Sequence, residues 1–363
     1  MTAGIADDHV YMRRCLELAC RGKGEVSPNP LVGAVIVKNG KIIAEGWHEH
    51  YGSAHAELNA IQNAIESVEG ATLYCNLEPC CHTEKQTPPC TPLIISHKLK
   101  RVVISNPDPN PMVSGKGVKQ LSDAGIEVTT GVLRKQGEYL NRFFFKYIQT
   151  GMPYVTMKIA QTLDGKIAER RGTMTWLTGN EAVEYVHRQR AGYDAVMIGA
   201  GTVSSDNPQL TVRKVQGRNP YRIIIDGRLS SPPDSKIFND EGKEGTWVFT
   251  AEDSDVQKIR SLENRGISIF RIPSDRKFHL DLNRILKILG TEKIISVLVE
   301  GGQELFSSFI SNNHLDELII LQAPVLFGRG LSAFDVDTRT EFELRSIEKL
   351  GNDIKIELKK KSD

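Results

Sequence analysis

Three short segments carry residue types that can bind one metal ion, and they constrain the fold more than any other feature. His55-Ala56-Glu57 opens a helical pattern, Pro79-Cys80 directly follows a strand pattern, and Cys90 comes further on. One imidazole and two thiolates give zinc three protein ligands and leave a fourth position for water. Glu57 stands where a carboxylate can move protons without ligating the metal. The fold must therefore bring these three segments to one point.

Two further interpretations of these residues remain open at this level. Cys81 could replace Cys80 as a ligand, although a Pro-Cys turn usually fixes the ligating cysteine and so favours Cys80. The second interpretation is a closed, structural zinc site whose fourth ligand is Cys81 or His82. This interpretation leaves Glu57 without a role. The order H-x-E then P-C is the pattern of zinc deaminases. Here, however, the second cysteine is Cys90, not a residue three positions after the first.

Length and charge exclude several classes of protein. The 363 residues suffice for two domains, and 46 Lys plus Arg against 45 Asp plus Glu give no reason to expect nucleic acid binding. No apolar run approaches the roughly 20 residues of a membrane helix. The first nine residues lack the apolar core of a signal peptide. Six cysteines without an export signal favour reduced thiols and a cytoplasmic location.

The first half alternates helical and strand patterns, which is typical of a three-layer α/β domain. Asp7 or Asp8 can cap a first helix, and Asn39-Gly40 predicts a hairpin turn. Asn29, held between two prolines, either builds a rigid turn or binds the edge of a heterocycle. The pattern predicts strands over 31–37, 41–45, 71–75, 101–105 and 126–130, and helices starting at 55–57 and over 93–97, 118–124 and 136–148.

The second half has two glycine-rich turns, 199–203 and 300–303, each at the end of a predicted strand. Such turns can bind phosphate through backbone N–H groups, and two of them suit a dinucleotide. The G-x-G-x-x-G fingerprint is absent, so a standard Rossmann domain is not supported. Asn180 is expected to cap a helix over 180–190. Strands are predicted over 154–160, 194–198, 221–226, 246–250, 267–272, 295–299, 315–321, 342–347 and 354–358.

Four arginines of the second half are candidate phosphate ligands, because guanidinium binds phosphate in a bidentate manner. Any one of them, taken singly, is more often a solvated surface residue. They are Arg188, Arg190, Arg213 and Arg222.

Together, the motifs resemble those of one family, the bifunctional deaminase/reductases of riboflavin biosynthesis, over nearly the whole chain and in the family's order. The motifs of the deaminase half are N-P-x-V-G at 29–33, H-A-E at 55–57, L-E-P-C at 77–80, T-P-P-C at 87–90 and D-P-N-P at 108–111. Those of the reductase half are Lys158 with L-D-G-K at 163–166, W-x-T-G at 176–179, G-A-G-T-V at 199–203 and V-E-G-G at 299–302.

The resemblance implies a cytidine-deaminase-like domain over 1–148, a linker over 149–152 and a dihydrofolate-reductase-like α/β domain over 153–363. The first domain would deaminate 2,5-diamino-6-ribosylamino-4(3H)-pyrimidinone 5′-phosphate with zinc. The second would reduce the ribosyl group of 5-amino-6-(5-phosphoribosylamino)uracil to ribityl with NADPH. The expected partners are these small molecules, without nucleic acid or membrane, and a homo-oligomer stays open.

The resemblance also implies roles for individual residues. It gives one zinc per chain on His55, Cys80 and Cys90, proton transfer by Glu57, and Lys158 as a catalytic group near the ribose. The residues that it assigns to substrate are Asn29, His48, Arg190, Leu210, Arg213 and Glu300. The residues that it assigns to the cofactor are Ala160, Trp176, Thr202, Asp206, Gly302, Gln303 and Glu304.

Two positions depart from the family's pattern. Gln86 stands where the family usually has a basic residue before T-P-P-C, in a loop that is one residue longer, so either Lys85 takes this role or the substrate contact is weaker. Met174 stands where the family often has a substrate-contacting Ser. One rival hypothesis is a nucleoside or tRNA-base deaminase with an unrelated second domain, which predicts P-C-x-x-C and a basic surface, and this chain has neither. Two others are a non-enzymatic module held by structural zinc and an enzyme that has lost one of the two activities, which the loop departures leave open.

Overall fold

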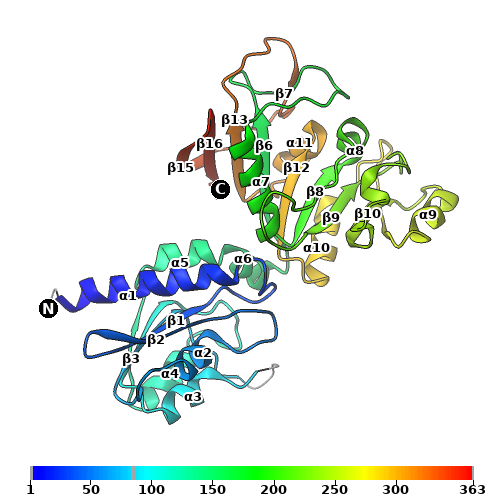
Figure 1. Cartoon of the computed structure of the whole chain (residues 1–363). Helices are drawn as coiled ribbons and strands as arrows, with labels where there is room; N and C mark the ends of the chain where they lie inside the picture. The colour runs from blue at the N-terminus through cyan, green and yellow to red at the C-terminus, as the bar shows by residue number, and fades with distance from the viewer. Residues whose placement is uncertain (1–2, 83–86, 362–363) are drawn as a thin grey trace. The chain divides into compact units, whose positions relative to one another are not determined.

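The computed structural model describes residues 3–82 and 87–361, and the chain divides into two compact units, Met1–Gly151 and Met152–Asp363 (Figure 1). Both units combine helices with a central sheet, which confirms the predicted α/β class. In the described part of the chain, no helix is long and apolar enough to cross a bilayer.

The first unit contains a five-stranded sheet in the order β2-β1-β3-β4-β5. Strand β1 is antiparallel to β2 and β3, whereas β3, β4 and β5 run parallel. The predicted hairpin turn is confirmed, since Asn39 and Gly40 have φ angles of 50° and 74°, as such a turn requires. The strands are β1 Gly33–Lys38, β2 Lys41–Trp47, β3 Thr72–Leu77, β4 Arg101–Asn106 and β5 Glu127–Thr130.

Helices cover both faces of this sheet (Figure 1). Because side chains alternate along β1, Val35 and Val37 pack with Met12 and Leu18 of α1, while Ile36 faces the opposite layer. The arrangement is therefore the predicted three-layer one. On one side lie α1 Ala3–Ala19 and α5 Arg134–Leu140, and on the other α2 Ala56–Gln62, α3 Cys90–Ser96 and α4 Lys116–Asp123.

Two predictions for the first unit are wrong. The single helix over 136–148 is two helices, α5 and α6 (Arg142–Thr150), with a break at Asn141. The Asn141 side chain is bonded to the backbone N–H and carbonyl of Leu31 at 2.8 and 2.9 Å, a contact 110 residues away in sequence. Asp8 lies within α1 instead of capping it. Its carboxylate accepts two hydrogen bonds of 2.8 Å from Arg101.

The second unit has a nine-stranded sheet in the order β11-β10-β9-β8-β12-β6-β13-β16-β15. The strands from β11 to β13 are parallel, and β16 and β15 add an antiparallel edge. The bounds are β6 Tyr154–Gln161, β8 Ala195–Gly199, β9 Tyr221–Ile225, β10 Thr246–Ala251, β11 Ser268–Ile272, β12 Ser296–Gly301, β13 Glu317–Gln322, β15 Phe342–Leu350 and β16 Asp353–Lys360. A separate pair consists of β7 Lys166–Ala168 and β14 Leu331–Ser332.

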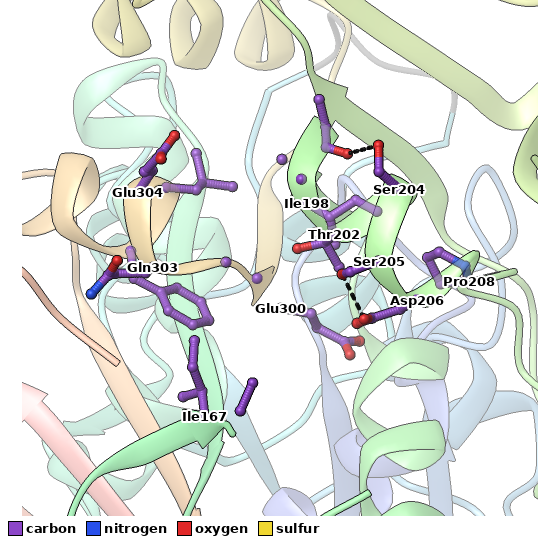
Figure 2. Close-up of a pocket in the computed structure, with 18 of the residues that line it drawn as sticks. Ile167, Ile198, Thr202, Ser204, Ser205, Asp206, Pro208, Glu300, Gln303 and Glu304 are labelled. Atoms are coloured by element: carbon purple, nitrogen blue, oxygen red, sulfur yellow. Dashed lines mark hydrogen bonds between the residues drawn. The ribbon is translucent and has the colours of Figure 1, made fainter. Parts of the chain in front are cut away.

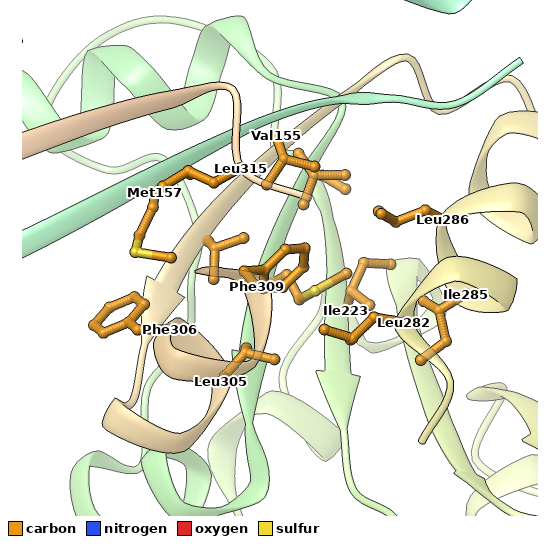
Figure 3. Close-up of a cluster of buried hydrophobic side chains, with 14 of the residues drawn as sticks. Val155, Met157, Ile223, Leu282, Ile285, Leu286, Leu305, Phe306, Phe309 and Leu315 are labelled. Carbon is orange, nitrogen blue, oxygen red and sulfur yellow. The ribbon is translucent and has the colours of Figure 1, made fainter. Parts of the chain in front are cut away.

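Helices pack on both faces of this sheet as well. Figure 3 shows Phe306 and Phe309 of α11 with Leu286 of α10 against Val155 and Met157 of β6. Helix α7 covers the other face, and it begins after Gly179, so the predicted capping role of Asn180 is wrong. The carboxyl ends of the parallel strands share one edge, where α/β sheets bind ligands. The helices are α7 Asn180–Gly192, α8 Ala200–Asp206, α9 Val256–Glu263, α10 Leu282–Thr291 and α11 Gln303–Ser311.

Candidate active sites

The first unit brings His55, Cys80 and Cys90 together. His55 is the residue before α2, Cys80 follows β3, and Cys90 is the first residue of α3. The Nδ1 atom of His55 lies 3.5 Å from Sγ of Cys80 and 3.3 Å from Sγ of Cys90, and all three ligand atoms lie within 4.8 Å of one another. A tetrahedral zinc with bonds of about 2.0 Å to nitrogen and 2.3 Å to sulfur needs N···S separations of roughly 3.5 Å. The donor set therefore fits zinc.

Backbone hydrogen bonds fix the two cysteines relative to each other. The Cys80 carbonyl accepts from the N–H groups of Cys90 at 3.0 Å and Thr91 at 3.1 Å, and Cys90 N lies 3.3 Å from Sγ of Cys80. On the other side of the imidazole, Thr87 Oγ1 lies 3.0 Å from Nε2 of His55 and orients the ring. Sequence reasoning gave Thr87 no role, although it begins the T-P-P-C motif.

Glu57 lies in the first turn of α2 and is only 3% exposed. Its carboxylate does not belong to the group of three ligand atoms, and it follows His55 by two residues at the start of the same helix. Burial, with the Glu57 charge as the next contribution, raises the pKa of Cys75 on β3. Cys75 is thus a neutral core residue behind the site.

Asn29 and His48, the predicted substrate residues of this unit, lie beside the cluster. The Asn29 amide donates to Nε2 of His48 at 3.2 Å, and Nδ1 of His48 donates to the Ala54 carbonyl at 3.0 Å. Burial lowers the pKa of His48, which favours the neutral ring that these bonds require. Its ring centroid is 5.6 Å from that of His55. A flat heterocycle at the metal would meet these polar groups.

Cys81 and His82 do not join the cluster. The Cys81 thiol instead points to the Met112 carbonyl at 3.9 Å. Within residues 3–82 and 87–361, the cluster contains no fourth His, Cys, Asp or Glu, which argues against a closed structural site. Lys85 and Gln86, where the loop departs from the family's pattern, lie outside the described residues.

Glu78 anchors the turn that carries Cys80. Its buried carboxylate accepts hydrogen bonds from the N–H groups of Asp108 at 3.2 Å, Gly115 at 3.0 Å and Val118 at 3.1 Å. A β-carbon on Gly117 would lie 2.3 Å from the Pro79 carbonyl, so the segments are in close contact. Glu78 therefore fixes the metal-binding turn against the loop before α4.

Replacing Glu78 by Ala is expected to weaken zinc binding by about 10- to 100-fold, the usual effect of losing a group that orients a ligand. Three buried backbone donors would lose their acceptor, and the Cys80 turn would become mobile. Competition with a chromophoric chelator measures the affinity. The exposed Glu69→Ala is the control, and equal affinity in both variants would contradict the anchoring role.

The second unit contains a cavity of about 1140 Å³ at the carboxyl ends of β6, β8, β9 and β12. Every residue that the resemblance assigns to the reductase half lines it. These are Lys158, Ala160, Trp176, Arg190, Thr202, Asp206, Leu210, Arg213, Glu300, Gly302, Gln303 and Glu304. Met174 lines it too, so the departure from the family's Ser lies at the site.

A buried ionic group lies at one end of this cavity. Arg190 of α7 donates to both oxygens of Glu300 at 2.6 and 2.9 Å, and Nζ of Lys158 lies 3.4 Å from Oε2 of Glu300. Burial alone would raise the pKa of Glu300, but Arg190 and Lys158 lower it to about 2. Glu300 is therefore ionised near neutral pH and compensates both cations.

The two glycine-rich turns meet in the middle of the cavity. A β-carbon on Gly199 or Gly201 would touch nothing within 4 Å, whereas one on Gly301 would lie 2.9 Å from Thr202 Oγ1. The backbone at 199–201 thus faces open space, where a ligand can approach closely. Figure 2 shows Thr202, Ser205 and Asp206 on one side of the opening and Gln303 and Glu304 on the other.

Polar contacts position several of the lining residues. Ser205 Oγ donates to Asp206 at 2.6 Å. Burial raises the pKa of Asp206, and this hydrogen bond and the Lys158 charge oppose the shift only in part. The Arg213 backbone N–H donates to Nδ1 of His187 at 3.0 Å. Burial and the Arg190 charge lower the pKa of His187 to about 4, so the ring is a neutral acceptor.

Arg171 is a cavity residue that sequence reasoning missed. Its guanidinium donates to the Glu304 carboxylate at 2.6 Å and to the side-chain oxygen Oε1 of Gln303 at 2.9 Å. These bonds hold the loop before Trp176 against the start of α11. Arg171 belongs to no recognisable motif, so only the folded chain identifies it.

Two of the four candidate phosphate-binding arginines do not line the cavity. Arg222 is 2% exposed, and its guanidinium is occupied by Asp240 at 2.7 Å and by two backbone carbonyls. Arg188 pairs with Glu184 on the surface of α7. Since neither arginine lines the cavity, neither is a candidate phosphate ligand there.

Comparison with known proteins finds a separate family model in each of the two units. The family model of the RibD C-terminal domain matches residues 153–356, more than half of the chain. The chain belongs to the RibD family. A second model, the cytidine and deoxycytidylate deaminase zinc-binding region, matches residues 5–106.

Individual RibD proteins are similar over almost the full length. Riboflavin biosynthesis protein RibD of Bacillus amyloliquefaciens is 44% identical over 90% of this chain and 86% of its own. RibD of Acinetobacter baumannii superposes with a TM-score of 0.89 at 36% identity, covering 99% of this chain and 100% of that one. The Thermotoga maritima diaminohydroxyphosphoribosylaminopyrimidine deaminase/5-amino-6-(5-phosphoribosylamino)uracil reductase has a TM-score of 0.86 at 40% identity, covering 98% and 99%.

RibD membership confirms the predicted fold and the general function. The chain is a bifunctional deaminase and reductase of riboflavin biosynthesis, with a cytidine-deaminase-like first domain and a RibD reductase second domain. These domains imply zinc in the first and a nicotinamide cofactor in the second.

Proposed function

We propose that this RibD protein first deaminates 2,5-diamino-6-ribosylamino-4(3H)-pyrimidinone 5′-phosphate and then reduces 5-amino-6-(5-phosphoribosylamino)uracil with NADPH. The observation that carries the proposal is the pairing of two separate sites. One is a cluster of three metal ligands preceding and following the buried Glu57 in the chain, and the other is a large cavity with a buried cationic end. The six free cysteines suit the reducing cytoplasm, where we place the reaction.

In the first site, Glu57 is the proton carrier. Zinc on His55, Cys80 and Cys90 supplies Lewis acidity that makes water nucleophilic near neutral pH. Glu57 accepts a proton from the attacking water and delivers it to the departing amine. Asn29 and His48 form a hydrogen-bonded pair that holds the polar edge of the pyrimidine.

In the second site, Lys158 is the electrophilic group. NADPH would supply the hydride, and the ring-opened ribosylamine offers its C1′ imine carbon, which is at the aldehyde level, to receive it. The Lys158 ammonium, 3.4 Å from Oε2 of Glu300, is the group that stabilises and protonates the substrate nitrogen that takes up the electron pair of the C=N bond. Arg190 is occupied by its two hydrogen bonds to the Glu300 carboxylate, which hold that carboxylate in place. The exposed Arg213 is therefore the arginine that binds the substrate phosphate.

A two-stage assay tests the order of steps. The purified zinc-loaded protein is given the diaminopyrimidine phosphate, and ammonia release is followed before NADPH is added. We expect NADPH oxidation only after deamination, because the reductase site is assigned to the uracil compound. Oxidation of NADPH with the undeaminated compound, while ammonia release is blocked, would refute the order.

Replacing Cys90 by Ser is expected to remove the single zinc of each chain, because a hydroxyl is a poor substitute for a thiolate ligand. Elemental analysis of the purified variant measures the metal content. Cys81→Ser is the matched control and should keep its zinc, since the Cys81 thiol points to the Met112 carbonyl. Full zinc in Cys90→Ser would move the ligand set to Cys81 or His82, and loss of zinc in Cys81→Ser would make Cys81 a ligand.

A further inference from the structure

The far end of the reductase cavity carries positive charge that the proposed reaction does not use. Arg228 and Lys277 line the cavity where β9 ends, whereas Glu300 and Lys158 lie on β12 and β6. The strand order β9-β8-β12-β6 places three strand spacings between the two ends. At about 4.8 Å for each spacing, this is roughly 14 Å, the scale of an extended dinucleotide.

Two loops in close contact form this end of the cavity. A β-carbon on Gly227 would lie 2.0 Å from the Phe278 carbonyl, so only glycine permits the approach. The Arg228 guanidinium lies 5.2 Å from the centre of the Phe278 ring. The Asp226 carboxylate accepts from the backbone N–H groups of Ser230 and Ser231 at 2.8 and 2.7 Å. The start of the loop after β9 is therefore fixed, and the Asp226 carboxylate is already bonded.

Arg228 and Lys277 keep their charges available. His279, two residues after Lys277, pairs with Asp275 at 3.0 Å, and the backbone N–H of Lys277 bonds the same carboxylate. Across residues 3–82 and 87–361, neither Arg228 nor Lys277 takes part in a salt bridge, and both side chains are exposed. Two exposed cations on a rigid wall favour a dianionic group.

We propose that Arg228 and Lys277 bind the 2′-phosphate on the adenosine ribose of NADPH. The assignment rests on the proposed reductase function, with the nicotinamide beside Lys158. The glycine turns at 199–201 and 301–302 lie between the two ends of the cavity and suit the pyrophosphate. The adenosine half then extends to the end of β9. The 2′-phosphate is the group that distinguishes NADPH from NADH, so these two residues set the cofactor preference.

Steady-state kinetics of Arg228→Gln with Lys277→Gln tests the assignment, with the deaminated substrate saturating. We expect KM for NADPH to rise about tenfold for each residue, the effect of one charge-assisted hydrogen bond, with kcat unchanged. KM for NADH should not change, because NADH lacks the phosphate. The exposed Arg276→Gln, next to Lys277 but outside the cavity lining, is the matched control.

Direct binding of 2′,5′-ADP, measured by calorimetry in the absence of substrate, provides a second measurement that does not depend on turnover. The wild-type protein should bind 2′,5′-ADP more tightly than 5′-AMP, and the double variant should bind both alike. An unchanged NADPH preference in a folded variant would overturn the assignment. A parallel loss with NADH and NADPH would also overturn it, because it would indicate a structural role. If the wild-type protein oxidises neither cofactor with this substrate, the proposed reductase function fails instead.

Discussion

Replacing Glu57 by Gln is expected to lower the rate of ammonia release by about 10²- to 10⁴-fold, the usual contribution of a general acid–base group. Glutamine fills the same volume in the first turn of α2 but cannot accept a proton. The three zinc ligands belong to other positions, so the variant should keep its metal. Reduction of the deaminated substrate should also be unchanged, since that site lies in the other unit.

Three measurements on one preparation check this expectation: ammonia release, zinc content and NADPH oxidation with supplied uracil compound. Glu66→Gln, an exposed change just beyond α2, is the control and should retain all three. A fully active Glu57→Gln protein would favour the structural zinc site that the sequence left open. Loss of zinc together with activity would show that Glu57 supports the fold of the cluster instead of the chemistry.

Replacing Lys158 by Met should produce the opposite pattern, with reduction lowered by about 10²- to 10³-fold and deamination unaffected. The expected size is that of removing one preorganised group that stabilises charge in the transition state. Methionine preserves most of the side-chain volume on β6. Glu300 keeps its two bonds to Arg190, so the buried carboxylate remains compensated and the unit should stay folded.

The measurement is single-turnover NADPH oxidation, which separates the hydride step from product release. Cofactor binding, measured by fluorescence titration, should be close to that of the wild-type protein. Lys349→Met on the exposed edge strand β15 is the control. A normal hydride rate in Lys158→Met would remove Lys158 from the chemistry and leave it as a partner of Glu300 alone.

The sequence was sufficient for the metal cluster because each ligand belongs to a local motif. A residue before a helix, a Pro-Cys turn after a strand and a helix start each have a recognisable signature, and backbone hydrogen bonds from Cys90 and Thr91 to Cys80 join the last two. The glycine turns of the reductase half could be located for the same reason. The choice of Cys80 over Cys81 depended on the Pro-Cys turn, and the structure places the Cys80 thiol beside His55.

The features that sequence reasoning missed depend on contacts between distant segments. Asn141 breaks a good helical pattern because its side chain bonds to Leu31. Asp8 looks like a helix cap until Arg101 approaches it from β4. Arg222 resembles a free cation until Asp240 occupies it. In each case the competing partner lies elsewhere in the chain, and periodicity carries no information about it.

The distribution of thiols gives the two halves unequal chemical vulnerability. All six cysteines lie between positions 15 and 90, in the first unit, and the reductase unit has none. Two of them, Cys80 and Cys90, have sulfur atoms within 4.8 Å of each other. Thiol-directed reagents such as mercurials therefore act on the amine-releasing half of the protein, and hydride transfer continues in the half that has no thiol.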